Sequence, residues 1–87
     1  MKHYVYIIRS LKDGTYYKGY TTNYLIRLQA HNNGMSNYTR SKVPWELIYV
    51  EVYENKRTAL DREKKLKKCK ADYFEWLRLQ QSNILNK

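Results

Sequence analysis

Apolar and polar residues alternate over two early segments of the chain, a pattern typical of half-buried β-strands. Residues 3–9 and 15–20 are dense in tyrosine, valine and isoleucine, which favour a pleated strand. Lys12-Asp13-Gly14 separates them, and Asp-Gly readily adopts the positive φ values of a tight hairpin. Residues 46–53 are mostly apolar and predict a third strand in the interior of a small sheet.

Three helices are predicted between and after these strands. The side-chain oxygens near Thr21, Thr22 and Asn23 can cap a first helix that ends before Gly34. Asn55 can cap a second helix that runs to about residue 69. Residues 70–81 predict a third helix, because Phe74, Leu77 and Gln81 form one stripe beside Tyr73 and Trp76.

The remaining segments complete an α+β reading of the chain. Residues 35–44 are polar and end in a proline, so we expect a surface loop. The element order β-β-α-β-α-α predicts a small three-stranded antiparallel sheet flanked by helices. We expect a single domain over residues 1–81, since 87 residues bury one modest core, and a flexible C-terminal tail over residues 82–87.

The positive charge of the chain is concentrated in one segment. Seventeen lysines and arginines against eight acidic residues give a net charge of +9, and residues 56–70 alone carry +6. Such a surface attracts polyanions such as nucleic acid or an acidic membrane face. A lysine-rich helix face can also serve only to keep a protein in solution. The aromatic residues nearby favour a phosphate-binding surface.

Other classes of protein are disfavoured by the composition. No apolar run approaches the roughly 20 residues of a bilayer span, and the N-terminus has no signal-peptide core, so we expect a cytoplasmic protein. Cys69 is the only cysteine, which rules out an intramolecular disulfide. Cys69, His3 and His31 lack the spacing of a structural zinc site.

Two tyrosines of the predicted hairpin are candidates for chemistry. Tyr6 and Tyr17 can bring their hydroxyls together if both face the same side of the sheet. A phenol is a weak base at neutral pH unless nearby cations or a metal favour the phenolate. The alternative is that both tyrosines only pack, as most of the ten tyrosines here must.

Arg27 and His31 lie four residues apart and therefore share one face of the first predicted helix. A guanidinium can pair two oxygens of a phosphodiester, and an imidazole can donate to phosphate, orient water or carry a proton. The alternative for His31 is a structural role at a helix end. Leu25 and Leu28 can bury this helix against the sheet.

Glu63 interrupts the apolar stripe that Ala59 and Leu66 form on the second helix. A carboxylate directed inward needs a partner, and a hard divalent cation shared with a substrate phosphate suits a single carboxylate. An exposed Glu63 paired with Lys67 one turn later explains the pattern equally well.

The tripeptides Tyr4-Val5-Tyr6 and Tyr17-Lys18-Gly19, followed by Arg27 and His31, resemble the signature of the GIY-YIG nucleases. The resemblance extends from residue 3 to about residue 75. The chain most resembles short bacterial members that consist of little beyond the catalytic domain. It is also similar to the N-terminal nuclease domain of bacterial excision-repair enzymes. Tyr4 and Lys18 depart from the usual glycine and aliphatic residue of the two triplets.

This resemblance implies a GIY-YIG fold and a Mg²⁺- or Mn²⁺-dependent endonuclease that cuts DNA. It implies catalytic roles for Tyr6, Tyr17, Arg27, His31 and Glu63, with Glu63 holding the metal and either tyrosine activating water. A larger repair or recombination assembly is an expected partner. Lysines and arginines expected to contact phosphate are Lys18, Arg40, Lys42, Lys64, Lys65, Lys67 and Lys68.

Two further hypotheses compete with this one. The chain can be a nucleic-acid-binding module that has lost catalysis, in which case binding depends steeply on salt but not on metal. It can also be an interaction module for an acidic protein, anchored by Trp45, Trp76 or Tyr53.

Overall fold

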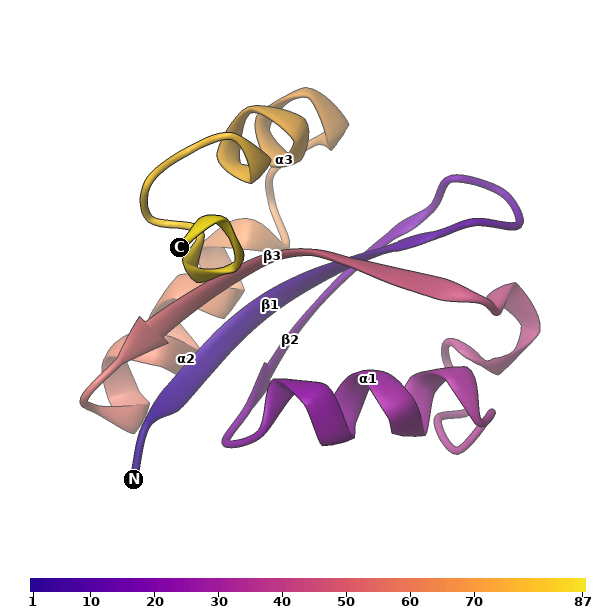
Figure 1. Cartoon of the computed structure of the whole chain (residues 1–87), viewed down its shortest axis with the longest axis horizontal. Coiled ribbons are helices and arrows are strands. Elements are labelled where there is room, and N and C mark those ends of the chain that lie inside the picture. Colours follow the sequence, from indigo (N-terminus) through magenta and orange to yellow (C-terminus); the bar gives the residue numbers. More distant parts are fainter.

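A computed structural model describes all 87 residues and confirms the predicted α+β architecture (Figure 1). The element bounds are β1 (His3–Ser10), β2 (Tyr16–Thr21), α1 (Tyr24–Asn32), the 3₁₀ helix η1 (Arg40–Lys42), β3 (Trp45–Tyr53), α2 (Lys56–Leu66), α3 (Ala71–Arg78) and the 3₁₀ helix η2 (Ile84–Asn86). None of the helices is both long enough and apolar enough to span a membrane.

The three strands form an antiparallel sheet in the order β2-β1-β3, so β1 is the central strand. The prediction that the third strand lies in the interior is therefore wrong, because β3 pairs only with β1. Its apolar character arises because residues on both of its faces are buried. The first hairpin turns where the sequence predicts, with Gly14 at a φ of 79°.

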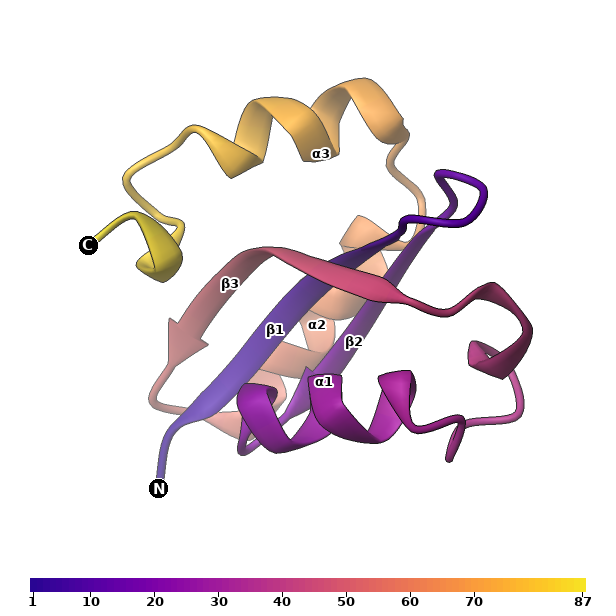
Figure 2. The ribbon, with the colours of Figure 1, turned by 45° about the vertical axis from the view of Figure 1, so that its right-hand side comes forward.

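Helices cover both faces of the sheet and create two apolar clusters. On one face, α2 and α3 pack on Val5, Ile7 and Tyr49. On the other, Tyr6, Ile8 and Val50 pack against Tyr24 and Leu28 of α1 and other side chains. In Figure 2, α2 lies behind the strands and α1 lies in front of them. The face covered by α1 also holds the buried polar side chains of His31 and Thr39, described below.

Local sequence signals explain where the helices begin. Asn23 accepts a hydrogen bond from the amide of Ile26, and Asn55 accepts from the amides of Arg57 and Thr58, as the capping prediction requires. The third helix ends at Arg78 instead of reaching residue 81. Leu25 does not bury α1, since it is 63% exposed.

A partly buried ion pair joins α2 to β3. The guanidinium of Arg62 donates to both carboxylate oxygens of Glu51 at 3.0–3.2 Å. Glu51 also accepts from the hydroxyls of Tyr49 and Tyr53. Because Arg62 points toward β3, the neighbouring Glu63 is presented about 100° around the helix from it.

The C-terminal residues fold back onto β3, in contrast to the flexible tail predicted for residues 82–87. Asn83 is only 1% exposed. Its amide accepts from the backbone N–H of Val50 and donates to the carbonyls of Ile48 and Arg78. The side chain therefore satisfies outward-facing groups of an edge strand, which would otherwise be open to pairing with another chain.

Candidate functional site

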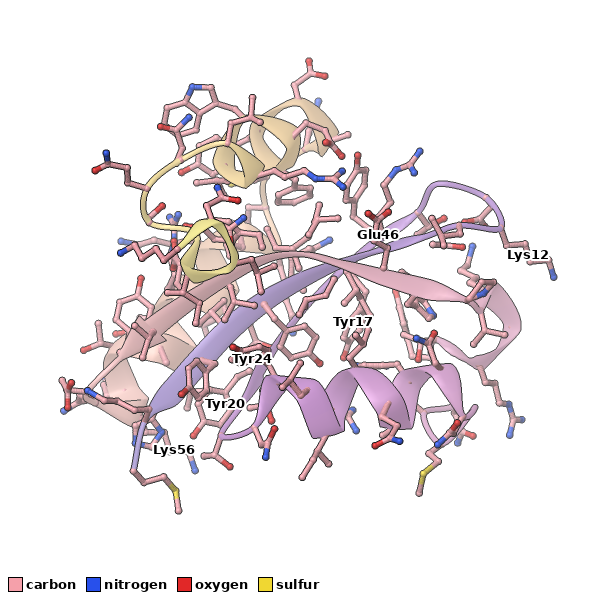
Figure 3. The ribbon with its side chains drawn as sticks, viewed as in Figure 1. Lys12, Tyr17, Tyr20, Tyr24, Glu46 and Lys56 are labelled. Carbon is pink, nitrogen blue, oxygen red and sulfur yellow. The ribbon has the colours of Figure 1, made fainter.

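The register of the hairpin places the two signature tyrosines on the same face of the sheet. Tyr6 lies opposite Gly19, and Tyr17 lies opposite Ile8. The ring centroids of Tyr6 and Tyr17 are 6.4 Å apart. Figure 3 shows Tyr17 between the strands and α1. The predicted juxtaposition of the two phenols is therefore present, although they are diagonal neighbours instead of a directly opposed pair.

Tyr6 is nearly fully buried because its ring folds across the backbone of Gly19. A β-carbon at position 19 would lie 2.5 Å from Cζ of Tyr6 and 2.8 Å from Cε2. No ordinary side chain fits at that distance, so the last glycine of the second tripeptide creates the space that the Tyr6 ring occupies.

The hydroxyl of Tyr6 joins a buried chain of hydrogen bonds. Its oxygen lies 2.9 Å from Nε2 of His31. The other ring nitrogen of His31, Nδ1, lies 2.7 Å from Oγ1 of Thr39. His31 and Thr39 are both 0% exposed. His31 therefore has a specific pair of partners and does not simply satisfy carbonyls at a helix end.

Two charged residues act on the Tyr6 phenol. Burial raises the pKa of Tyr6 to about 12, the Arg27 guanidinium opposes that rise, and the Glu63 carboxylate adds to it. Arg27 makes no ion pair within the protein, and its charge is therefore available to a bound anion. Arg27 lies on α1 and Glu63 on α2, so these two charges act on the pKa of the phenol from different helices.

His31 is a neutral imidazole at physiological pH. Burial, with the neighbouring Arg27 charge, lowers the pKa of His31 to about 4. A neutral imidazole carries a hydrogen on only one ring nitrogen. It can therefore donate a hydrogen bond to only one of its two partners, and toward the other partner its second ring nitrogen can only accept.

An open cleft of about 420 Å³ lies at the outer edge of β2. Its lining residues are Tyr16, Tyr17, Lys18, Tyr38 and Lys67. The ring of Tyr38 is 79% exposed and lies 5.7 Å from the ring of Tyr17. Burial, together with the nearby Lys67 charge, lowers the pKa of Lys18. The cleft thus combines aromatic rings with two cationic side chains, a combination suited to bases and phosphates.

Glu63 is a mostly buried carboxylate on α2. Its side chain is 17% exposed, and its only ion pair is a long one, 3.6 Å from Nζ of Lys67. The two sequence interpretations therefore coexist, because the carboxylate is directed inward and also has Lys67 beside it. No cluster of three or more histidine, cysteine or acidic side chains surrounds it. Oxygen donors beyond Glu63 would have to come from water and a substrate phosphate, which is the usual coordination of Mg²⁺ in phosphoryl chemistry.

The other residues expected to bind phosphate are not clustered on one part of the surface. Lys18 and Lys67 line the cleft. Lys42 instead donates to Asp13 at 2.7 Å, which ties the 3₁₀ helix η1 to the hairpin. The remaining residues of this expected set are exposed, and their side chains make no hydrogen bond or ion pair: Arg40, Lys64, Lys65 and Lys68.

Sequence reasoning missed the contribution of the loop before β3. Residues 35–44 were expected to form a polar surface loop, yet Thr39 is fully buried against His31. Trp45 is buried beside it and donates from Nε1 to the Thr39 carbonyl at 2.9 Å. The only available signal was the aromatic and hydroxyl residues of Tyr38-Thr39 within an otherwise polar segment.

Comparison with known proteins agrees with this geometry. A model of the GIY-YIG catalytic domain family matches residues 2–80. A UPF0213 protein of Clostridium perfringens is 48% identical over 67 residues, covering 76% of this chain and 71% of that protein. A UPF0213 protein of Oceanobacillus iheyensis is 42% identical over 79 residues, covering 90% of this chain and 88% of that protein.

A solved structure has a similar fold. The solution NMR structure of a UPF0213 protein from Bacillus halodurans superimposes with a TM-score of 0.57 at 32% sequence identity. The alignment covers 98% of this chain and 90% of that protein. The names of these relatives state no activity.

Proposed function

Because the chain belongs to the GIY-YIG catalytic domain family, we propose that it is a divalent-metal-dependent endonuclease that hydrolyses phosphodiester bonds in DNA. The family relationship makes nucleic acid the substrate class. We further propose that the protein acts in the bacterial cytoplasm, in association with a larger repair or recombination assembly.

One observation supports this proposal above the others. The buried phenol of Tyr6 contacts His31 at 2.9 Å, while Arg27 and Glu63 act electrostatically on the same group. A purely structural tyrosine needs one hydrogen-bond partner. It does not need an unpaired guanidinium and a carboxylate from two separate helices, whereas phosphodiester hydrolysis uses both.

We assign the role of general base to Tyr6. As a phenolate, its oxygen takes a proton from the attacking water, and the water oxygen bonds to phosphorus while the bond to the leaving oxygen breaks. The leaving oxygen takes a proton from solvent, and Tyr6 returns its own proton to solvent before the next cycle. Arg27 stabilises the phenolate before the water attacks, and it stabilises the charge on the phosphate oxygens once the attack begins.

Tyr17 has a different role in this mechanism. It lines the open cleft and its ring lies 5.7 Å from the exposed ring of Tyr38, so in this proposal it contacts the nucleotide beside the scissile bond. Lys18 and Lys67 hold the flanking phosphates. Glu63 would hold a divalent ion, which would supply Lewis-acid stabilisation of the charge that develops during hydrolysis.

The proposal is tested with labelled single-stranded, duplex, flapped and branched DNA and matched RNA, each with Mg²⁺, Mn²⁺ or EDTA. Glu63→Gln is the test variant, and Glu54→Gln, an exposed carboxylate that pairs with Lys2, is the matched control. We expect metal-dependent cleavage that Glu63→Gln abolishes and Glu54→Gln retains. Tight binding without cleavage of any substrate would instead identify a binding module on a nuclease scaffold.

A further inference from the structure

Thr39 is held more rigidly than its place in a loop suggests. Its backbone N–H donates to Ser36, and its carbonyl accepts from the backbone N–H of Lys42 and from the indole of Trp45. These bonds fix the position of the side-chain hydroxyl. That hydroxyl is fully buried, and its only hydrogen-bond partner is Nδ1 of His31.

The chain of contacts from Tyr6 through His31 to Thr39 allows two arrangements of hydrogens. In the first, Nδ1 of His31 carries the hydrogen and donates to Thr39, and Tyr6 donates to Nε2. In the second, Thr39 donates to Nδ1, and Nε2 carries the hydrogen and donates to Tyr6. Heavy-atom distances of 2.7 and 2.9 Å are compatible with both arrangements.

The protonation state of Tyr6 distinguishes the two arrangements. While Tyr6 is protonated, each arrangement leaves one hydroxyl hydrogen unpaired, at a cost of about 1–3 kcal/mol: that of Thr39, which is 0% exposed, in the first, and that of Tyr6, which is 2% exposed, in the second. Once Tyr6 becomes a phenolate, the first arrangement places the lone pair of Nε2 against a negatively charged oxygen, which is repulsive. The second arrangement then leaves no hydroxyl hydrogen unpaired, and Nε2 donates to the phenolate.

We propose that Thr39 is a positioning residue whose hydroxyl donates to Nδ1 of His31, fixing the tautomer in which Nε2–H donates to the Tyr6 oxygen. This inference rests on the proposed function for its catalytic meaning, but the tautomer itself is a property of the protein without substrate. His31 then acts on the base as a hydrogen-bond donor. Together with Arg27, it gives the phenolate two donors from α1.

Thr39 also connects His31 to the wall of the cleft. The ring of the preceding residue, Tyr38, lies against Tyr17 at a tilt of 46°, and Trp45 packs against Tyr17 while its indole donates to the Thr39 carbonyl. The segment that contacts the nucleotide is therefore the same segment that orients the imidazole.

The tautomer is measured directly by long-range ¹H–¹⁵N NMR correlation of the histidine side chains at pH 7.5, without metal or nucleic acid. The chain has two histidines, and a His3→Gln variant assigns the signals. We expect one tautomer of His31, with the hydrogen on Nε2, in the wild type and in Thr39→Ser. Thr39→Val, which keeps the shape but removes the hydroxyl, is expected to show a second population with the hydrogen on Nδ1.

Either of two results overturns the inference: a wild-type His31 with its hydrogen on Nδ1, or a Thr39→Val protein with an unchanged single tautomer. If Thr39→Val does not fold, the wild-type spectrum still decides the direction of the bond. A protein that cleaves no substrate but shows the expected tautomers would contradict the proposed function and leave the positioning role of Thr39 intact.

Cleavage kinetics provide the second readout. We expect Thr39→Val to lower kcat about tenfold or more with little change in KM, and Thr39→Ser to restore most of the rate. Thr22→Val removes an exposed threonine hydroxyl at the start of α1 and is the matched control, with an unchanged rate. Equal rates in Thr39→Val and Thr39→Ser would contradict a role for the hydroxyl.

Discussion

The ring of Tyr6 lies directly across the backbone of Gly19, where a β-carbon would stand 2.5 Å from Cζ of the tyrosine. The two residues are partners in the β1–β2 register and come from the two signature tripeptides. One tripeptide therefore supplies the phenol that we propose as the general base, and the other supplies the space that its ring occupies.

A Gly19→Ala substitution should displace the Tyr6 ring and break its contact with His31. Because a misplacement of about 1 Å in a catalytic group can cost roughly 100-fold, we expect cleavage to fall by about that factor. Gly14→Ala is the control, since it introduces strain at a positive φ of 79° far from Tyr6. It should lower stability by about 1–2 kcal/mol without a comparable loss of cleavage. Similar rates for both variants would contradict the steric account.

The rate of cleavage should rise with pH if Tyr6 is the base. The pKa of Tyr6 is about 12, so the phenolate fraction grows about tenfold for each unit between pH 7 and 9. We expect kcat/KM to follow that slope and Tyr6→Phe to remove the activity. Tyr17→Phe should retain the slope at a reduced rate. A flat profile in the wild type would argue for a different base.

The stability of the fold should fall as the pH drops from about 6.5 to about 4. The folded pKa of His31 is about 4, below its ordinary value of 6.5, so the unfolded chain binds more protons in this window. We expect the free energy of unfolding to decrease by up to about 3 kcal/mol across it. Urea titrations at pH 7.5 and 4.5 measure this change, and His31→Gln should reduce it. An equal pH effect in that variant would assign the loss to other groups.

Near the C-terminal end of α2, the contribution of a lysine to phosphate binding should depend on where its side chain lies, and not only on its charge. Lys67 lines the cleft, whereas Lys65 is exposed and makes no ion pair. We expect Lys67→Ala to weaken DNA binding and to reduce the slope of log K against log salt by about 0.7–0.9, and Lys65→Ala to change both less. Fluorescence anisotropy at several salt concentrations measures both quantities. Equal losses would show that the whole basic face of α2 contacts the substrate.

Asn83 should contribute to stability without contributing to catalysis. Its amide satisfies the backbone N–H of Val50 and the carbonyl of Ile48, and Asn83→Ala leaves these two groups buried without that partner, whereas the Arg78 carbonyl still accepts from Asn86. We expect a loss of about 2–4 kcal/mol in the free energy of unfolding, measured in urea at pH 7.5. Asn37→Ala, at an exposed asparagine without a side-chain hydrogen bond, is the control and should cost less than about 0.5 kcal/mol. An unchanged stability in Asn83→Ala would mean that water replaces the amide.

The sequence by itself determined the features that depend on neighbouring residues. The Asp13-Gly14 turn, the Asn23 and Asn55 caps and the order of strands and helices all follow from local backbone preferences and from periods of two or 3.6 residues. The resemblance to GIY-YIG nucleases likewise came from residue types at fixed spacing, and the family match confirms it.

The tertiary structure alone decided which distant residues meet. The hairpin register placed Tyr6 over Gly19. The path of the loop before β3 brought Thr39 against His31, and the C-terminal residues folded so that Asn83 bonds to the edge of β3. Leu25 shows the same limit, because a helical stripe predicts a buried side but not which residue faces the sheet. Such contacts join residues far apart in the chain, and their geometry depends on how whole elements pack, which no local pattern of residues encodes.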